Sequence, residues 1–85
     1  MDLKILAEDL TGIYDMVDPY ETRPGYETRE EAARHIGHAL KEWPAGDIRR
    51  VFINDLKGYV DDGLDDDGSI ADAIARLEEL AEVKG

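Results

Sequence analysis

The chain has 85 residues, no cysteine, and 21 acidic against ten basic residues, for a formal net charge of −11 at pH 7. A chain of this length folds as one domain with a single modest core, and without cysteine it has no disulfide, thiolate nucleophile or cysteine-ligated zinc. The negative charge repels nucleic acids and anionic lipids and attracts basic protein surfaces, so direct binding to DNA, RNA or a membrane is disfavoured.

The hydropathy pattern argues for a cytoplasmic protein. No apolar run approaches the roughly 18 residues of a transmembrane helix. The N-terminal MDLKILAEDL carries acids where a signal peptide has a basic segment. The acids are concentrated towards the two ends of the chain: residues 1–22 hold one base and six acids, residues 23–50 six bases and five acids, and residues 51–85 three bases and ten acids.

The first predicted helix covers residues 3–17. Its apolar residues recur at steps of three and four, as in an amphipathic helix, and are Leu3, Leu6, Leu10, Ile13 and Val17. Asp18 should end the helix, because the residue before a proline is pushed out of the helical region. Two prolines and a Pro-Gly pair then predict a turn-rich loop over residues 18–27.

The tetrapeptide Tyr-Glu-Thr-Arg occurs twice in this part of the chain, starting at Tyr20 and at Tyr26. In the second copy, Thr28 precedes Glu31 by three residues, which is the capping-box spacing at the start of a helix. The first copy is followed by a proline and cannot cap a helix in this way. We expect Tyr20 and Tyr26 either to pack at the edge of the core or to contact a partner.

Two further helices are predicted before residue 62. One covers residues 29–42, with the apolar side Ala33, Ile36, Leu40 and Trp43. Pro44-Ala45-Gly46 breaks it, and Asp47 is the expected N-cap of the next helix. The buried face of that helix is expected to comprise Ile48, Val51, Phe52, Leu56 and Tyr59. A strand at VFIND is rejected, because one isolated strand would have no partner.

The last predicted helix runs from residue 70 to about residue 83, and Ser69 with Asp72 repeats the capping-box spacing. Its apolar stripe comprises Ile70, Ala73, Ile74, Leu77, Leu80 and Ala81. Together the patterns predict an all-α fold: a small single acidic domain over residues 1–85, with about four short helices in a bundle or orthogonal array.

The stretch GLDDDGSIADAI has some features of a calcium loop. Asp65, Asp67 and Gly68 occupy the third, fifth and sixth positions of the EF-hand pattern. The leading aspartate and the closing glutamate of that pattern are missing, so the oxygen ligands are too few for a calcium site. We interpret the stretch as a solvated acidic turn before a helix, whose dipole favours the acids, with weak cation binding as the alternative.

A second candidate metal site lies on the helix over residues 29–42. Glu31, His35, His38 and Glu42 form one stripe at i, i+4, i+7 and i+11, opposite the apolar residues. Two imidazoles at this spacing can hold zinc or nickel if a second copy of the chain completes the shell. The stripe lacks the spacing of a metalloprotease and is predicted to be a solvated face without a metal.

Catalytic residues are not expected. Ser69 is the one serine in the chain, and no threonine has a histidine at a spacing that indicates a catalytic pair. No glycine-rich phosphate loop follows a strand. We therefore predict no enzyme activity and no cofactor.

The acids are the main candidate for a functional surface. Carboxylates about one helical turn apart approximate the spacing of phosphates along a nucleic-acid strand, so such a surface can occupy a groove of lysines and arginines. The predicted partner-binding acids are Asp61, Asp62, Asp65, Asp66, Asp67, Asp72, Glu78, Glu79 and Glu82.

In its length, acidity and lack of catalytic residues, the chain resembles the DNA-mimic proteins of phages and mobile elements, such as anti-CRISPR and antirestriction proteins. The resemblance is one of composition and covers no motif. It implies a non-enzymatic inhibitor or regulator that binds the basic surface of a nucleic-acid-handling protein. The alternative is that the acidity only keeps the protein soluble.

A helical adaptor or self-associating module is the second functional hypothesis. Its contact patch would be the loop over residues 18–28 with Tyr14, Tyr20 and Tyr26, because tyrosine supplies contact area at interfaces with little loss of entropy. A homodimer is one form of this hypothesis. A metal-linked dimer through His35 and His38 is a third.

Overall fold

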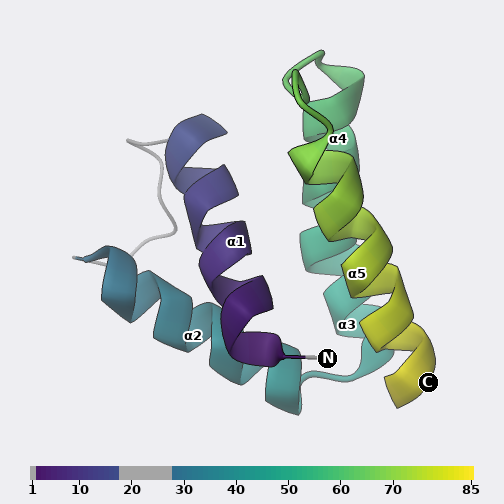
Figure 1. The fold of residues 1–85 in the computed structure, drawn as a ribbon. Coiled ribbons are helices and arrows are strands. Elements are labelled where there is room, and N and C mark those ends of the chain that lie inside the picture. The colour runs from purple at the N-terminus through teal and green to yellow at the C-terminus, as the bar shows by residue number, and fades with distance from the viewer. Residues whose placement is uncertain (1, 18–27) are drawn as a thin grey trace. The chain divides into compact units, whose positions relative to one another are not determined.

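The computed structural model describes residues 2–17 and 28–85 (Figure 1). Within these residues every regular element is helical and no strand occurs, which confirms the predicted all-α fold of about four helices. None of these helices is both long and apolar enough to cross a membrane. The predicted loop over residues 18–27 lies outside the described residues. The chain divides into two compact units, residues 1–42 and 43–85.

The first unit contains α1 (Leu3–Val17) and α2 (Arg29–Glu42), both with the predicted bounds. Asp2 caps α1, since its Oδ1 accepts hydrogen bonds from the backbone N–H groups of Lys4 at 3.0 Å and Ile5 at 3.4 Å. At the start of α2, the N–H of Glu31 donates to Oγ1 of Thr28 at 3.1 Å. The predicted role of Thr28 as a cap is therefore confirmed.

The two helices of this unit pack against each other (Figure 1). A Cβ on Gly37 would lie only 3.5 Å from Cβ of Ala7, so the backbones approach closely at these small residues. Thr11 is buried, and its hydroxyl donates to the carbonyl of Ala7 at 2.7 Å within the same helix. The buried apolar residues of the unit are Leu6, Ala7, Leu10, Ile13, Tyr14, Ile36, Ala39 and Leu40.

The second unit begins with a helical segment over residues 45–61, made of α3 (Ala45–Ile48), the π-helical η1 (Arg49–Ile53) and α4 (Asn54–Asp61). The predicted N-cap, Asp47, is wrong. Pro44 holds the N-cap position, with φ −68° and ψ 160°, because proline's restricted φ suits a helix start. The carboxylate of Asp47 instead pairs with Arg50 at 3.2 Å.

The π-helical stretch changes which residues of this segment are buried. The predicted face is confirmed at Ile48, Phe52 and Leu56. Val51 and Tyr59 are only half-buried, and Ile53 is buried instead. Backbone hydrogen bonds in a π-helix join residues i and i+5, which brings Ile53 to the same side as Ile48. The rejection of a strand at VFIND is confirmed, since these residues are helical.

A glycine ends α4. The N–H of Gly63 donates to the carbonyl of Val60 at 3.0 Å, and the N–H of Leu64 donates to the carbonyl of Tyr59 at 3.0 Å. Gly63 itself has φ 79°, in the left-handed region. These are the bonds of a Schellman motif, in which glycine is favoured because it carries no Cβ. The chain leaves α4 at this point and enters the acidic turn.

The last helix, α5 (Ser69–Lys84), packs along the helical segment over residues 45–61 (Figure 1). It buries Ile70, Ala73, Leu77, Leu80 and Ala81. At its C-terminal end, Nζ of Lys84 donates to the carbonyl of Trp43 at 2.9 Å. The ring of Trp43 stacks on Phe52, with the centroids 5.4 Å apart. Trp43 is half-buried, so Phe52 is the more central of the two predicted aromatic core residues.

Two glycines of the second unit should respond to alanine in opposite directions. Gly58 lies inside α4 and a Cβ there meets nothing within 4 Å, so Gly58→Ala should stabilise the protein by about 0.5–1 kcal/mol. Gly68 has φ 81°, so Gly68→Ala should destabilise it by about 1–2 kcal/mol. Urea unfolding followed by circular dichroism measures both, and a loss of stability in Gly58→Ala would contradict the helical placement.

Candidate functional site

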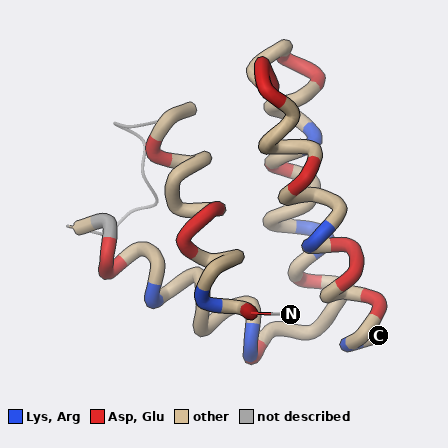
Figure 2. The backbone as a smooth tube through the Cα atoms, viewed as in Figure 1, with Lys and Arg blue, Asp and Glu red and all other residues tan. Residues whose placement is uncertain are grey.

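Exposed carboxylates gather on the turn between α4 and α5 and along α5 (Figure 2). Asp61 is the last residue of α4 and Asp62 is its C-cap. Asp65, Asp66 and Asp67 follow within the turn. All nine acids predicted to bind a partner lie in this part of the second unit, but their structural surroundings divide them into three groups.

The first group caps α5. Oδ1 of Asp65 accepts the N–H of Ile70 at 2.9 Å, and its Oδ2 accepts the N–H of Ala71 at 3.2 Å. Oδ1 of Asp67 accepts the N–H of Ser69 at 3.0 Å. The predicted capping box of Ser69 with Asp72 is therefore wrong. The N-cap position belongs to Gly68, which has no side chain, and the left-handed turn at that residue brings the preceding aspartates back to the free N–H groups.

The hydrogen bonds of the turn also affect ionisation. Those from the Ser69 side chain and backbone N–H to Asp67 hold the pKa of its carboxyl below the ordinary value. A lowered pKa in the folded state means that ionised Asp67 stabilises the fold at pH values above its unfolded pKa. That contribution is lost as the pH falls through the lowered pKa. The hydrogen bonds from Ser69 thus favour the ionised form of Asp67.

The second group forms ion pairs on α5. Oδ2 of Asp72 lies 3.2 Å from Nε of Arg76, one turn later on the same helix. Oε1 of Glu78 lies 3.4 Å from Nζ of Lys57 on α4. Glu78 and Lys57, together with Arg49, Ile53, Asn54 and Glu82, line a hollow of about 260 Å³. This side of α5 therefore carries both signs of charge.

The third group comprises Asp61, Asp62, Asp66, Glu79 and Glu82. Their side chains are exposed, and no ion pair within the described residues involves them. They can accept hydrogen bonds from lysine or arginine at little desolvation cost, since they stay in water until a partner arrives. Of the nine predicted acids, these five are the ones with no hydrogen bond or ion pair to another described residue through the side chain.

The predicted tyrosine patch is not assembled in the described residues. Tyr20 and Tyr26 lie outside them, and Tyr14 is buried, with 8% of its surface exposed. Tyr14 faces the interior because it continues the apolar stripe of α1 one turn after Leu10. It therefore does not contribute to an exposed contact patch.

The histidine stripe lies on the surface of α2, where His35 and His38 are both exposed. Nε2 of His35 lies 3.9 Å from Oε1 of Glu31. In the described part of the chain, no group of three or more His, Asp or Glu side chains is placed to hold a metal ion. A metal shared between two chains stays an untested alternative.

A second surface feature lies between α1 and α2 and was missed in the sequence. It is a groove of about 720 Å³, lined by Leu3, Lys4, Ala7, Glu8, Thr11, Glu30, Ala33, Arg34, Gly37 and Lys41. The sequence did contain a pattern that indicates this face. The α2 residues that line the groove include Glu30, Arg34, Gly37 and Lys41, which recur as a stripe at helical spacing. This stripe is one residue before the histidine stripe and has the same helical spacing.

Comparisons of the chain with models of protein families, with curated proteins and with solved structures gave no match.

Proposed function

We propose that the chain acts in the cytoplasm as a non-enzymatic inhibitor or regulator. It binds the basic surface with which a partner protein handles nucleic acid, in the manner of a DNA mimic. The observation that carries this proposal is the group of exposed carboxylates on Asp61, Asp62, Asp66, Glu79 and Glu82. The other four predicted acids serve this surface indirectly, through helix caps and ion pairs.

The charge of the second unit supports binding to a basic partner. Residues 43–85 contain eleven acids and five bases. Two of those bases, Lys57 and Arg76, are already paired with Glu78 and Asp72. The field near the turn is therefore strongly negative, which speeds encounter with a basic surface and excludes nucleic acid itself.

The arrangement of the carboxylates supports mimicry of a phosphate backbone. On α5, Glu79 and Glu82 are three residues apart, which places them about 4.5 Å apart along the helix axis. Asp61, Asp62 and Asp66 extend the negative surface beyond the start of that helix. The caps from Asp65 and Asp67 order the turn before binding, so less conformational entropy is lost when a partner docks.

The test is affinity capture of partners from a cell lysate at low salt, with release by salt steps and, separately, by excess duplex DNA. We expect a nucleic-acid-handling protein that elutes at moderate salt and is displaced by DNA, since both compete for one basic surface. Asp61→Lys with Asp66→Lys should weaken its capture at least about tenfold.

The matched control is Glu31→Lys with Glu42→Lys on α2, which changes the net charge equally but leaves the acidic turn intact. Capture should survive in this control. Equal loss in both double variants would mean that net charge alone attracts the partner. A partner that resists high salt and excess DNA would overturn the proposal of mimicry.

A further inference from the structure

The groove between α1 and α2 has an apolar floor. Ala7 and Thr11 are buried, and Leu3, Ala33 and Gly37 are half-buried. The hydroxyl of Thr11 donates to the carbonyl of Ala7, so Thr11 brings no unsatisfied donor to the groove. Ala7 and Gly37 meet at this floor, and neither has a side chain larger than a methyl group. This floor is suited to helix packing.

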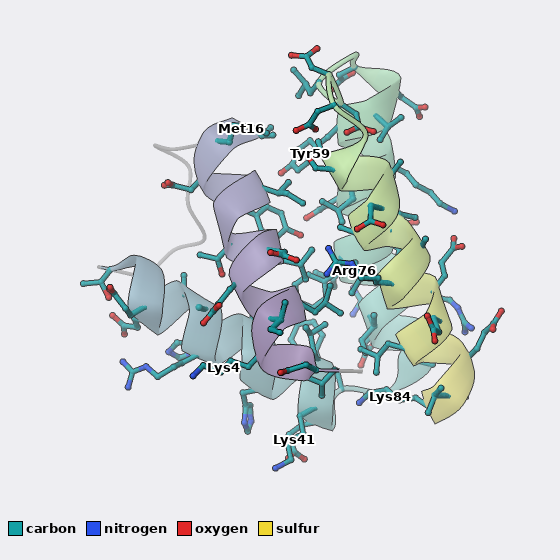
Figure 3. All side chains as sticks on the ribbon, in the orientation of Figure 1. Lys4, Met16, Lys41, Tyr59, Arg76 and Lys84 are labelled. Carbon is teal, nitrogen blue, oxygen red and sulfur yellow. The ribbon has the colours of Figure 1, made fainter. Side chains whose placement is uncertain are left out.

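Charged side chains border the floor in a definite order. In Figure 1, α1 and α2 run in roughly opposite directions along the groove. Lys4 and Lys41 therefore lie towards one end of the groove, and Figure 3 shows both side chains projecting from their helices. Glu30 lies towards the other end, and Glu8 and Arg34 lie between.

We propose that this groove is a self-association face that takes the α1 and α2 helices of a second copy of the chain. In this dimer the two-fold axis lies in the interface, perpendicular to the helix axes. The groove end with Lys4 and Lys41 in each copy then meets the Glu30 end of the groove in the other copy. Glu8 and Arg34 lie near the axis, where each approaches its own symmetry mate, so the attraction between the copies rests on the contacts at the two ends of the groove. A two-fold axis along the helices would instead place lysines against lysines, which is unfavourable.

The charge of the groove identifies the occupant. Its lining contains three bases and two acids, whereas the whole chain has a net charge of −11. Two copies of so acidic a chain repel each other, so association must use a face where acids do not dominate. An occupant of a single charge sign would match either the three bases or the two acids of the lining, but not both. A second copy supplies the opposite sign at each end of the groove.

The size of the face predicts a weak dimer. Helices of 15 and 14 residues are about 22 Å long, and two side by side are about 20 Å wide. The face therefore buries roughly 400–600 Å² of each copy, below the approximately 800 Å² of a standard interface. We expect a dissociation constant of about 10–500 µM at physiological salt.

Sedimentation equilibrium from about 10 µM to about 1 mM tests this dimer. The proposed dimer contains two symmetry-related contacts between Glu30 of one copy and Lys41 of the other. Glu30→Lys places a lysine opposite Lys41 at both contacts, and Lys41→Glu places a glutamate opposite Glu30 at both. Each variant alone should dimerise at least tenfold more weakly than the natural chain, on the order of the effect of like charges at an interface. An equimolar mixture should recover the natural affinity to within about threefold, because both contacts become complementary again.

Two control variants have the same charge changes outside residues 1–42. Glu82→Lys matches Glu30→Lys, and Arg49→Glu matches Lys41→Glu, and both should dimerise as the natural chain does. Circular dichroism melts confirm that every variant is folded. A chain that stays monomeric up to about 1 mM, or a mixture that dimerises no better than its components, overturns the proposal. The acidic turn has no part in this test, so its outcome is independent of the function proposed above.

Discussion

Leu77→Ala should lower the free energy of unfolding by about 3 kcal/mol, within the range of about 2–5 kcal/mol for leucine truncation in a core. Leu77 lies on α5, and none of its surface is exposed. Its removal leaves a cavity beside the helical segment over residues 45–61, because packed helices relax only partly. Small proteins are stable by about 5–15 kcal/mol, so the expected loss is a large fraction of the total.

Urea unfolding monitored by circular dichroism measures this loss. The matched control is Val83→Ala, because Val83 lies on the same helix with 80% of its surface exposed. We expect the control to change the stability by less than about 0.5 kcal/mol. A loss below about 1 kcal/mol in Leu77→Ala would show that the side chain is not held in a packed core.

Asp65→Ala should cost about 1–2 kcal/mol, because one carboxylate accepts two backbone N–H groups at the start of α5. Those N–H groups, of Ile70 and Ala71, have no other carbonyl within the helix to bind. Their amide hydrogens should exchange faster in the variant, whereas the amide of Leu77 in the middle of the helix should change only through the global stability.

The effect of charge is separated from that of capping by two further variants. Asp65→Asn keeps one oxygen acceptor, so it should lose about half as much stability as Asp65→Ala. Asp66→Asn removes the neighbouring negative charge without removing a cap and should stay within about 0.5 kcal/mol of the natural chain. If Asp66→Asn were as harmful as Asp65→Ala, the turn would depend on charge rather than on the hydrogen bonds.

The caps also bear on the proposed function. A turn held by Asp65 and Asp67 presents Asp61, Asp62 and Asp66 in one arrangement. Loss of the Asp65 cap should therefore weaken partner capture without removing any of the exposed contact acids. This separates residues that position the acidic surface from those that would touch a partner.

Local patterns in the sequence determined the first two helices to the residue. Apolar spacing, the proline after Asp18 and the hydroxyl of Thr28 each act within about one turn of the chain, so they can be recognised without a tertiary structure. The same holds for the buried face of α5, where Ile70, Ala73 and Leu77 follow the helical period.

Only the tertiary structure decided the features that depend on unusual backbone or on neighbouring helices. The π-helical stretch moved Ile53 into the interior, and the left-handed Gly68 gave the cap of α5 to the aspartates before it rather than to Ser69. The sequence does not distinguish the roles of the nine predicted acids, since each is a carboxylate in a polar stretch. Their roles separate only when folding sets which of them reaches a free N–H, which reaches a base, and which is left facing water.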